Sequence, residues 1–225
     1  MRIVAVADTH CYEDDLAAIP DGDIFVHAGD LLQSGSVDEL HRVVSWLREL
    51  PHRYKLVIAG NHDWCFARES ALAQHLLAGV ATYLQDSGTT IAGISFWGSP
   101  WQPEFCGWAF NLPRGPALRE RWSHIPPRID VLVTHGPPRG IGDLVGGHRA
   151  GCDDLLDAVQ RLQPALHLFG HIHEDGGFWR DGVTAFANVT TDECTRAATV
   201  VDMDPHTKAI VPTFIPNKRA AGSSV

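Results

Sequence analysis

The sequence predicts an α/β to α+β fold in which two β-sheets form a sandwich flanked by helices. Strand-length apolar runs alternate with segments of helical periodicity, and several of these runs end at polar side chains that could bind a ligand. The chain has 225 residues, 44% of them apolar, which is enough for a substantial core. We therefore expect one domain over residues 1–215. A flexible tail is expected over residues 216–225, where the sequence becomes small and polar.

The first part of the chain predicts strands that alternate with two helices. The strands are expected at residues 1–7, 24–28 and 54–59. A helix is expected over residues 36–50, because apolar residues recur at helical spacing between an N-cap at Ser36 and a stop at Pro51. A second helix is expected over residues 68–78, with Gly79 as its C-cap.

The middle of the chain predicts short strands and then a long loop. The strands are expected at 81–84, 89–92 and 95–97, with a turn at Ser87-Gly88 between the first two. Residues 98–116 are rich in proline and aromatic residues and show little periodicity. We expect a long ordered loop there, and such loops in compact domains are often functional.

The last part predicts two helices, at 116–124 and 152–162, and further strands. These strands are expected at 129–134, 165–169, 178–180, 183–188, 198–202 and 209–213. We expect the last four to close a second sheet.

Composition excludes some classes of partner. The formal net charge is −9 and there is no basic stripe, which argues against extended nucleic acid but not against one small phosphoester near bound metal ions. The five cysteines are scattered without a CxxC pair, which favours free thiols in a reducing compartment. With no signal-peptide pattern and no run of the roughly 20 apolar residues that a membrane span needs, we expect a cytoplasmic protein without a membrane partner. The oligomeric state stays open.

Five short runs place metal-ligand side chains just after an apolar stretch. They are Asp8-Thr9-His10, Gly29-Asp30, Gly60-Asn61-His62-Asp63, Thr134-His135-Gly136 and Gly170-His171-Ile172-His173. Strand ends in an open α/β sheet face a ligand crevice, so residues far apart in sequence can converge there. The set holds carboxylate, carboxamide and imidazole but no thiolate, which suits Mn, Fe, Zn or Mg.

The spacing within these runs fits a site for two ions. Asp8 and His10 are two residues apart and would point the same way on an extended segment, and His171 and His173 share this spacing. A two-metal phosphoester site needs ions about 3.5–4 Å apart and a carboxylate that bridges them. Asp30, directly after a glycine, can sit in a tight turn and face both ions.

The ordered set D-x-H, G-D, G-N-H-D, H-G and G-H-x-H resembles the calcineurin-like metallophosphoesterases and has no position missing. Three further runs, GSPWQPEFCGWAFN, VTHGPPRGIGD and FGHIHE, resemble the metallophosphoesterase-domain-containing branch, whose members act on cyclic nucleotides and other phosphodiesters. The resemblance implies the metallophosphoesterase fold and a hydrolase. It also implies two divalent metal ions, with manganese favoured and Fe, Zn, Mg, Co and Ni compatible.

The resemblance also implies a role for each motif residue. The first ion would be held by Asp8, His10 and His173, the second by Asn61, His135 and His171, and Asp30 would bridge them. His62 resembles the family's catalytic histidine, and Asp63 resembles the partner that holds its imidazole in the needed tautomer. The implied reaction is direct attack of a metal-bridging hydroxide on phosphorus, with His62 assisting the leaving oxygen.

The long loop and the substrate leave alternatives open. Trp101, Phe105, Trp108 and Asn111 could line a nucleobase pocket, since aromatic faces accept bases by stacking, or the aromatic rings could instead cover a sheet edge. The favoured activity is a phosphodiesterase of small, including cyclic, nucleotides. The alternatives are a phosphomonoesterase of broad specificity and a nucleotide-binding regulator or scaffold with weak catalysis. The intact ligand set favours an enzyme.

Overall fold

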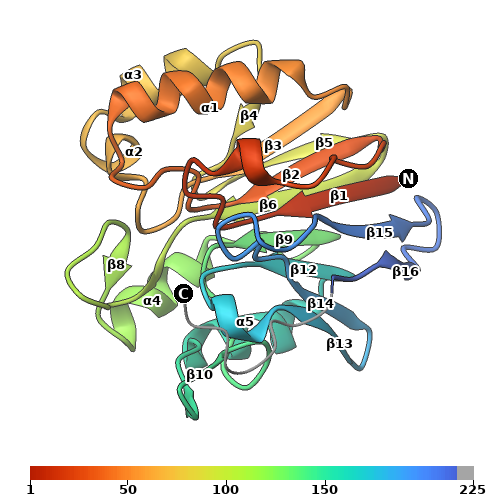
Figure 1. Ribbon diagram of the computed structural model, residues 1–225. Coiled ribbons are helices and arrows are strands. Elements are labelled where there is room, and N and C mark those ends of the chain that lie inside the picture. Colours follow the sequence, from red (N-terminus) through yellow and green to blue (C-terminus); the bar gives the residue numbers. More distant parts are fainter. Residues whose placement is uncertain (217–225) are drawn as a thin grey trace.

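The computed structural model describes residues 1–216, whose elements form four layers (Figure 1). Two six-stranded sheets pack face to face, with strand orders β16-β15-β1-β2-β3-β4 and β13-β14-β12-β9-β6-β5. Helices cover the outer face of each sheet (Figure 1). The predicted two-sheet sandwich flanked by helices is confirmed.

The first sheet has a parallel centre that is extended by two antiparallel strands. Its strands are β1 (Arg2–Val6), β2 (Ile24–Ala28), β3 (Tyr54–Ile58), β4 (Thr82–Tyr83), β15 (Thr199–Met203) and β16 (Ile210–Phe214). Strands β1 to β4 run parallel, and β15 pairs antiparallel with β1. The expectation that the last two strands close the second sheet is therefore wrong. Apolar alternation identifies a strand, but it does not name the strand's neighbour.

The second sheet also has a parallel centre. Its strands are β5 (Ser87–Ile91), β6 (Ile94–Ser99), β9 (Val131–Thr134), β12 (Leu166–Phe169), β13 (Gly177–Asp181) and β14 (Thr184–Asn188). Strands β6, β9, β12 and β14 are parallel, with antiparallel β5 and β13 at the edges. The turn predicted at Ser87-Gly88 is wrong, since both residues lie in β5. The chain reverses at Ala92-Gly93, where both residues have positive φ, as a two-residue hairpin loop requires.

The helices follow their sequence signals closely, with one break. They are α1 (Val37–Glu49), α2 (Trp64–Arg68), α3 (Ser70–Leu77), α4 (Pro116–Ser123) and α5 (Asp153–Leu162). Ser36 caps α1 in a capping box with Glu39. The helix expected over 68–78 is α3 alone, because Glu69 leaves the helical conformation at φ −128°. The short helix α2 and the 3-10 segments η1 (Glu13–Asp15) and η2 (His173–Asp175) were not expected.

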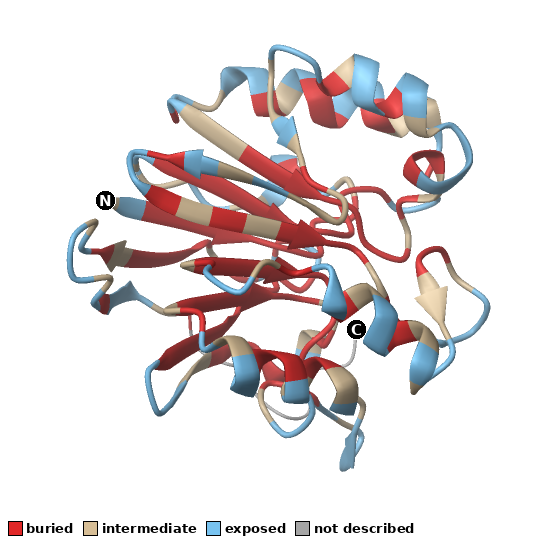
Figure 2. Cartoon of the chain, turned by 180° about the vertical axis from the view of Figure 1, so that it is seen from behind, coloured by how far each residue is buried: buried red, intermediate tan, exposed pale blue. Residues whose placement is uncertain are grey.

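The central strands are buried on both faces (Figure 2), and successive residues along them join different parts of the core. In β1 and the residue after it, Ile3, Ala5 and Ala7 face the second sheet and join the cluster between the sheets. Val4 and Val6 face α1, α2 and α3 in a second cluster. A third cluster lies between the second sheet and α4 and α5. Because successive side chains point to opposite faces, each central strand packs one face between the sheets and the other face against helices.

Smaller ladders complete the described chain. The loop over 98–116 contains β7 (Gln102–Pro103) and β8 (Asn111–Leu112), which pair in parallel, so it is more structured than expected. A hairpin joins β10 (Leu144–Val145) and β11 (His148–Arg149). Of the tail predicted over 216–225, only Pro216 is described, and it is buried and accepts a hydrogen bond from Arg196; residues 217–225 lie outside the described residues. Among the helices of residues 1–216, none is long and apolar enough to span a membrane.

Candidate metal centre

The carboxyl ends of the parallel strands from both sheets meet at one edge of the sandwich. The residues after β1, β2 and β3 are Asp8, His10, Asp30, Asn61 and His62, and those after β9 and β12 are His135, His171 and His173. An open pocket of about 270 Å³ lies at this edge. It is lined by His10, Asp30, Gln33, Asn61, His62, Phe105, His171, His173 and Glu193.

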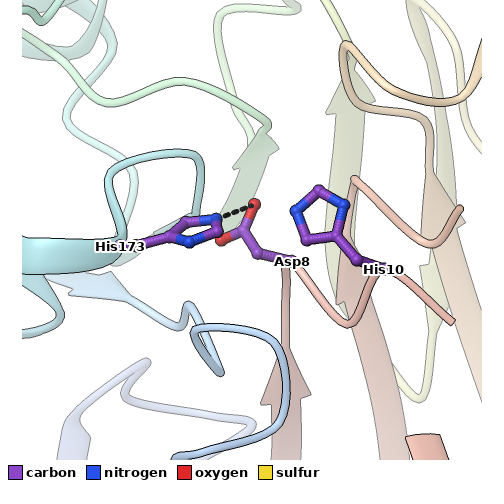
Figure 3. A group of neighbouring side chains, drawn as sticks. All are labelled: Asp8, His10 and His173. Carbon is purple, nitrogen blue, oxygen red and sulfur yellow. Dashed lines mark ion pairs between the residues drawn. The ribbon is translucent and has the colours of Figure 1, made fainter. Parts of the chain in front are cut away.

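Ligand atoms converge in three overlapping groups at this edge, and one of them is His10, Asp30 and His62. Potential ligand atoms of Asp8, His10 and His173 lie within 4.8 Å of one another, and these side chains point toward each other in Figure 3. The same spacing relates Asp30, His135 and His171. Asp30 lies between these last two groups, because its Oδ2 is 3.7 Å from His10 Nε2 and 3.4 Å from His135 Nε2.

Three of the four candidate ligand histidines are oriented by an acceptor at Nδ1. The Leu32 carbonyl lies 3.2 Å from His10 Nδ1 and the Ala28 carbonyl 3.0 Å from His135 Nδ1. A carboxylate oxygen of Asp192 lies 3.3 Å from His173 Nδ1. A proton at Nδ1 leaves the lone pair of Nε2 free to bind a metal ion, which is the usual arrangement for a metal-binding imidazole.

The atoms around His135 Nε2 indicate whether a cation could bind there. Its Nδ1 can only donate to the Ala28 carbonyl, so Nε2 of the neutral ring carries a lone pair. That lone pair faces Asn61 Oδ1 at 2.9 Å and Asp30 Oδ2 at 3.4 Å. Burial lowers the pKa of His135, but the Asp30 carboxylate outweighs it and raises this pKa to about 9. The oxygens of Asn61 and Asp30 therefore favour positive charge at this point, which a divalent ion could supply.

The backbone at the site is held in an uncommon conformation. Four candidate ligands, Asp8, His10, Asp30 and His171, have φ between 48° and 69°. Asp and His tolerate this left-handed region better than most residues, and such residues gather at functional sites. Gly60 is required for a different reason, because a Cβ there would collide with Asp30 and with the His135 ring. This explains why a glycine precedes Asn61.

His62 lines the pocket, but Asp63 does not orient it. The imidazole Nδ1 of His62 donates to the Gln33 carbonyl at 2.7 Å. The buried Asp63 carboxylate instead accepts backbone N–H groups of Leu31, Leu32 and Gly60. The expected contact between Asp63 and His62 is therefore wrong. Asp63 ties the turn after β2 to the turn after β3, where Asp30 accepts the backbone N–H of His62.

The structure separates the four loop residues that were considered for a nucleobase pocket. Phe105 lines the pocket and is 54% exposed. Trp101 instead donates to Asp86 at 2.7 Å and contacts Phe110, so it packs within the fold. The side chain of Asn111 donates to the Phe105 carbonyl and so stabilises the loop over residues 98–116. Trp108 stacks on His62. Only Phe105 lies where the pocket interpretation placed it.

Three residues at the site were not foreseen. Gln33 contributes its carbonyl to His62, Asp192 holds His173, and Glu193 lines the pocket. A backbone carbonyl leaves no trace in a residue's identity, so Gln33 had no detectable signal. Asp192 and Glu193 belong to a run, TTDECT, that resembles no motif. Their positive φ values mark the run as constrained only once the structure is known.

Comparison with known proteins identifies the family. Residues 1–175 match the model of the calcineurin-like phosphoesterases. The chain belongs to the calcineurin-like phosphoesterase family. It is 45% identical over 215 residues to human metallophosphoesterase domain-containing protein 1, covering 84% of this chain and 65% of that protein. It is 38% identical over 218 residues to a UPF0046 protein of Caenorhabditis elegans, covering 84% of this chain and 55% of that one. The chain thus spans 55–65% of the length of these relatives.

Solved structures show the same fold. One superposes with a TM-score of 0.74 at 16% identity, covering 96% of this chain and 98% of that one. The protein TT1561 of Thermus thermophilus superposes with a TM-score of 0.63 at 15% identity, with the same coverage. The family uses divalent metal ions, and the Asp and His groups of this chain could bind them. Family membership points to a hydrolase.

Proposed function

We propose that this calcineurin-like protein is a two-metal phosphodiesterase of small substrates, nucleotides and cyclic nucleotides among them. The observation that carries the proposal is the pair of adjacent ligand groups with Asp30 between them, at the floor of an open pocket. In this proposal Asp8, His10 and His173 hold one ion and Asn61, His135 and His171 the other. When bound, two such ions supply positive charge to phosphoryl oxygens and lower the pKa of a bound water.

The charge of the pocket favours a diester over a monoester. Its lining includes the carboxylate of Glu193 and the candidate ligand Asp30, but no lysine or arginine among the described residues. A phosphodiester carries one negative charge, whereas a monoester carries nearly two near neutral pH. Without a lysine or arginine beyond the ions, the second charge of a monoester gains little further compensation and lies near Glu193.

Two side chains suit the non-phosphate part of a nucleotide. The exposed ring of Phe105 stands at the wall of the pocket, where a nucleobase could pack against it. Gln33 lines the same pocket and offers a carboxamide for polar contacts. These features support a small planar ligand and argue against a polymer, since the described lining has no row of cations for successive phosphates.

In this proposal His62 assists the leaving oxygen. Its Nδ1 is held by the Gln33 carbonyl, so a protonated ring would donate from Nε2 while keeping that hydrogen bond. Such help matters most when the leaving group is a poor one. A sugar alkoxide needs a proton as it departs, whereas p-nitrophenolate is stable as an anion.

The test compares His62→Ala with the unmodified protein in manganese-dependent hydrolysis. We expect kcat for 2′,3′-cyclic AMP to fall by about 10²–10⁴-fold, with a smaller loss for bis-p-nitrophenyl phosphate. Metal content should be unchanged. Full turnover by the variant would contradict the role of His62.

Two other outcomes would replace the proposal. Preference of the unmodified protein for p-nitrophenyl phosphate over the bis ester would indicate a phosphomonoesterase. No turnover of any substrate, together with micromolar binding of AMP or GMP, would indicate a nucleotide-binding regulator.

A further inference from the structure

The indole of Trp108 lies on the face of the His62 imidazole. The ring centroids are 4.1 Å apart and the planes differ by 20°, which is a stacked arrangement. Trp108 is half-buried and is not among the residues that line the pocket. Its ring is therefore in contact with the proposed catalytic histidine and not with the space that substrate would occupy.

The loop that carries Trp108 is fastened to the motif that carries His62. The backbone N–H of Ala109, the next residue, donates to the carbonyl of Asn61, the residue before His62, at 3.1 Å. The Trp108 N–H donates to the Phe105 carbonyl, and Asn111 donates to that same carbonyl from its side chain. These bonds fix the backbone of Trp108 relative to His62, and the stacking contact places its indole on the imidazole.

His62 has few other constraints. One hydrogen bond, from Nδ1 to the Gln33 carbonyl, sets the direction of the ring, and the His10 ring meets it edge-on with centroids 4.6 Å apart. A ring held by one hydrogen bond can tilt about that bond. A flat indole against its face opposes this motion, and it also attracts an imidazolium through the negative face of its π-system.

We propose that Trp108 is a positioning residue, which fixes the plane of His62 so that Nε2 points at the leaving oxygen. This inference rests on the proposed function of His62. Phe105, on the same loop, has the different task of forming the pocket wall. The two aromatic residues therefore predict different kinetic effects, since displacement of a catalytic group by about 1 Å can cost up to about 10²-fold in rate.

The experiment measures kcat and KM of Trp108 variants with 2′,3′-cyclic AMP and with bis-p-nitrophenyl phosphate. Trp108→Ala should lower kcat for the cyclic nucleotide by about 10–100-fold, with little change in KM and a smaller loss for the aryl ester. Trp108→Phe restores a flat ring and should recover most of kcat. Trp108→Leu keeps apolar bulk without a flat ring and should behave like the alanine variant.

A double variant separates positioning from every other role. If Trp108 acts only through His62, Trp108→Ala should cost little further in a His62→Ala background. Trp46→Ala is the matched control, because this half-buried tryptophan of α1 contacts Phe25 and His27 rather than the pocket. It should alter thermal stability but neither kcat nor KM.

The outcomes that overturn the inference are distinct from those that overturn the proposed function. An increase in KM with unchanged kcat would make Trp108 a substrate contact. Losses that multiply in the double variant would show that it does not act through His62. Full turnover by His62→Ala alone would instead remove the proposed role of His62, and the positioning inference with it.

Discussion

The two sheets contribute different chemistry to one site. The first sheet supplies both candidate carboxylate ligands and the carboxamide, namely Asp8, Asp30 and Asn61, together with His10. The second sheet supplies only imidazoles, from His135, His171 and His173. The first sheet therefore carries the negative charge that would balance two dications, and the second completes their coordination. Two of the candidate ligand groups, Asp8-His10-His173 and Asp30-His135-His171, draw on both sheets, whereas a third, His10, Asp30 and His62, follows strands of the first sheet alone.

Hydrogen bonds across the seam keep the two halves in register. His135 of the second sheet is held by the carbonyl of Ala28 at the end of β2. Asp8 of the first sheet accepts the backbone N–H of His171. Thr190, just after β14, forms an isolated bridge with Ala7. The ligands are thus positioned by contacts between the sheets as much as by the strands that carry them.

Behind the ligands the halves are alike. In the first sheet, Thr9 lies 3.0 Å from Nε2 of the buried His27, and in the second, Thr134 lies 2.8 Å from Nε2 of the buried His167. Each pair is a threonine beside a candidate ligand and a histidine on the neighbouring strand. The two sheets therefore share a buried Thr–His pair beside their ligands, but only the first contributes carboxylate ligands. Three predictions test this difference.

The largest effect is expected at the residue that both ion sites share. Asp30→Asn should reduce metal content at both sites and lower turnover by at least about 10³-fold, because the negative charge between two dications is lost. The fold should tolerate the change, since the new carboxamide oxygen can still accept the His62 N–H that Asp30 now accepts at 2.8 Å. Elemental analysis with manganese-dependent hydrolysis measures both effects.

Two variants calibrate this result. Asp202→Asn removes an exposed carboxylate of β15, paired with Arg2, and should leave metal content unchanged. His10→Ala should weaken binding of the ion near Asp8 and His173 and leave binding of the ion near His135 unchanged. Two tightly bound ions per chain in Asp30→Asn would show that the sites do not share this carboxylate.

A smaller effect on metal binding is expected at Asp192, which contacts His173 Nδ1. Asp192→Asn replaces the carboxylate 3.3 Å from His173 Nδ1 and should weaken binding of one ion by about 10–100-fold, while the ion near His135 is retained. Calorimetric titration of the metal-free protein with manganese resolves the two steps. Glu193→Gln removes the same charge one residue further on. Equal weakening in both variants would assign the effect to charge rather than to the orientation of His173.

These contacts also show what the sequence could and could not predict. The strands β1 and β2 and the cap at Ser36 depend on local periodicity and local hydrogen bonds, so they follow from the sequence almost to the residue. The candidate ligands could be predicted because each follows a strand within a short motif. Asp192 could not, because nothing near it in the sequence records that it lies against His173.

The errors share a physical cause. The partner of β15 and the contacts of Trp108 are set by tertiary packing, to which neighbouring residues give no guide. Asp63 was expected at His62 because it follows that residue directly. Three backbone N–H groups, two of them from the turn after β2, attract its carboxylate instead. Proximity in sequence is a poor substitute for geometry at a site assembled from two sheets.

The smallest effect is expected at the buried His167, in the pH dependence of the unfolding free energy. Burial lowers the pKa of His167 to about 3, against about 6.5 in an unfolded chain. Between these values the unfolded chain binds the proton and the folded one does not, so the stabilising contribution is complete above pH 6.5 and is lost as pH falls toward 3. His167→Leu should therefore flatten the fall in unfolding free energy over this range by up to about 1.4 kcal/mol per pH unit.

Urea unfolding of chelator-treated protein between pH 4 and 7 measures this slope without metal release. At pH 7 the variant should lose only about 1 kcal/mol, since the Thr134 hydroxyl keeps its hydrogen bond to the Gly136 carbonyl at 2.8 Å. His27→Leu is the matched comparison. Burial also lowers the pKa of His27 to about 3, but Asp8 and Asp30 oppose that shift, whereas burial alone acts on His167. If the carboxylates act on His27 alone, Asp30→Asn should alter the pH dependence that His27 contributes and leave that of His167 unchanged; equal responses would show that both halves feel the same charge.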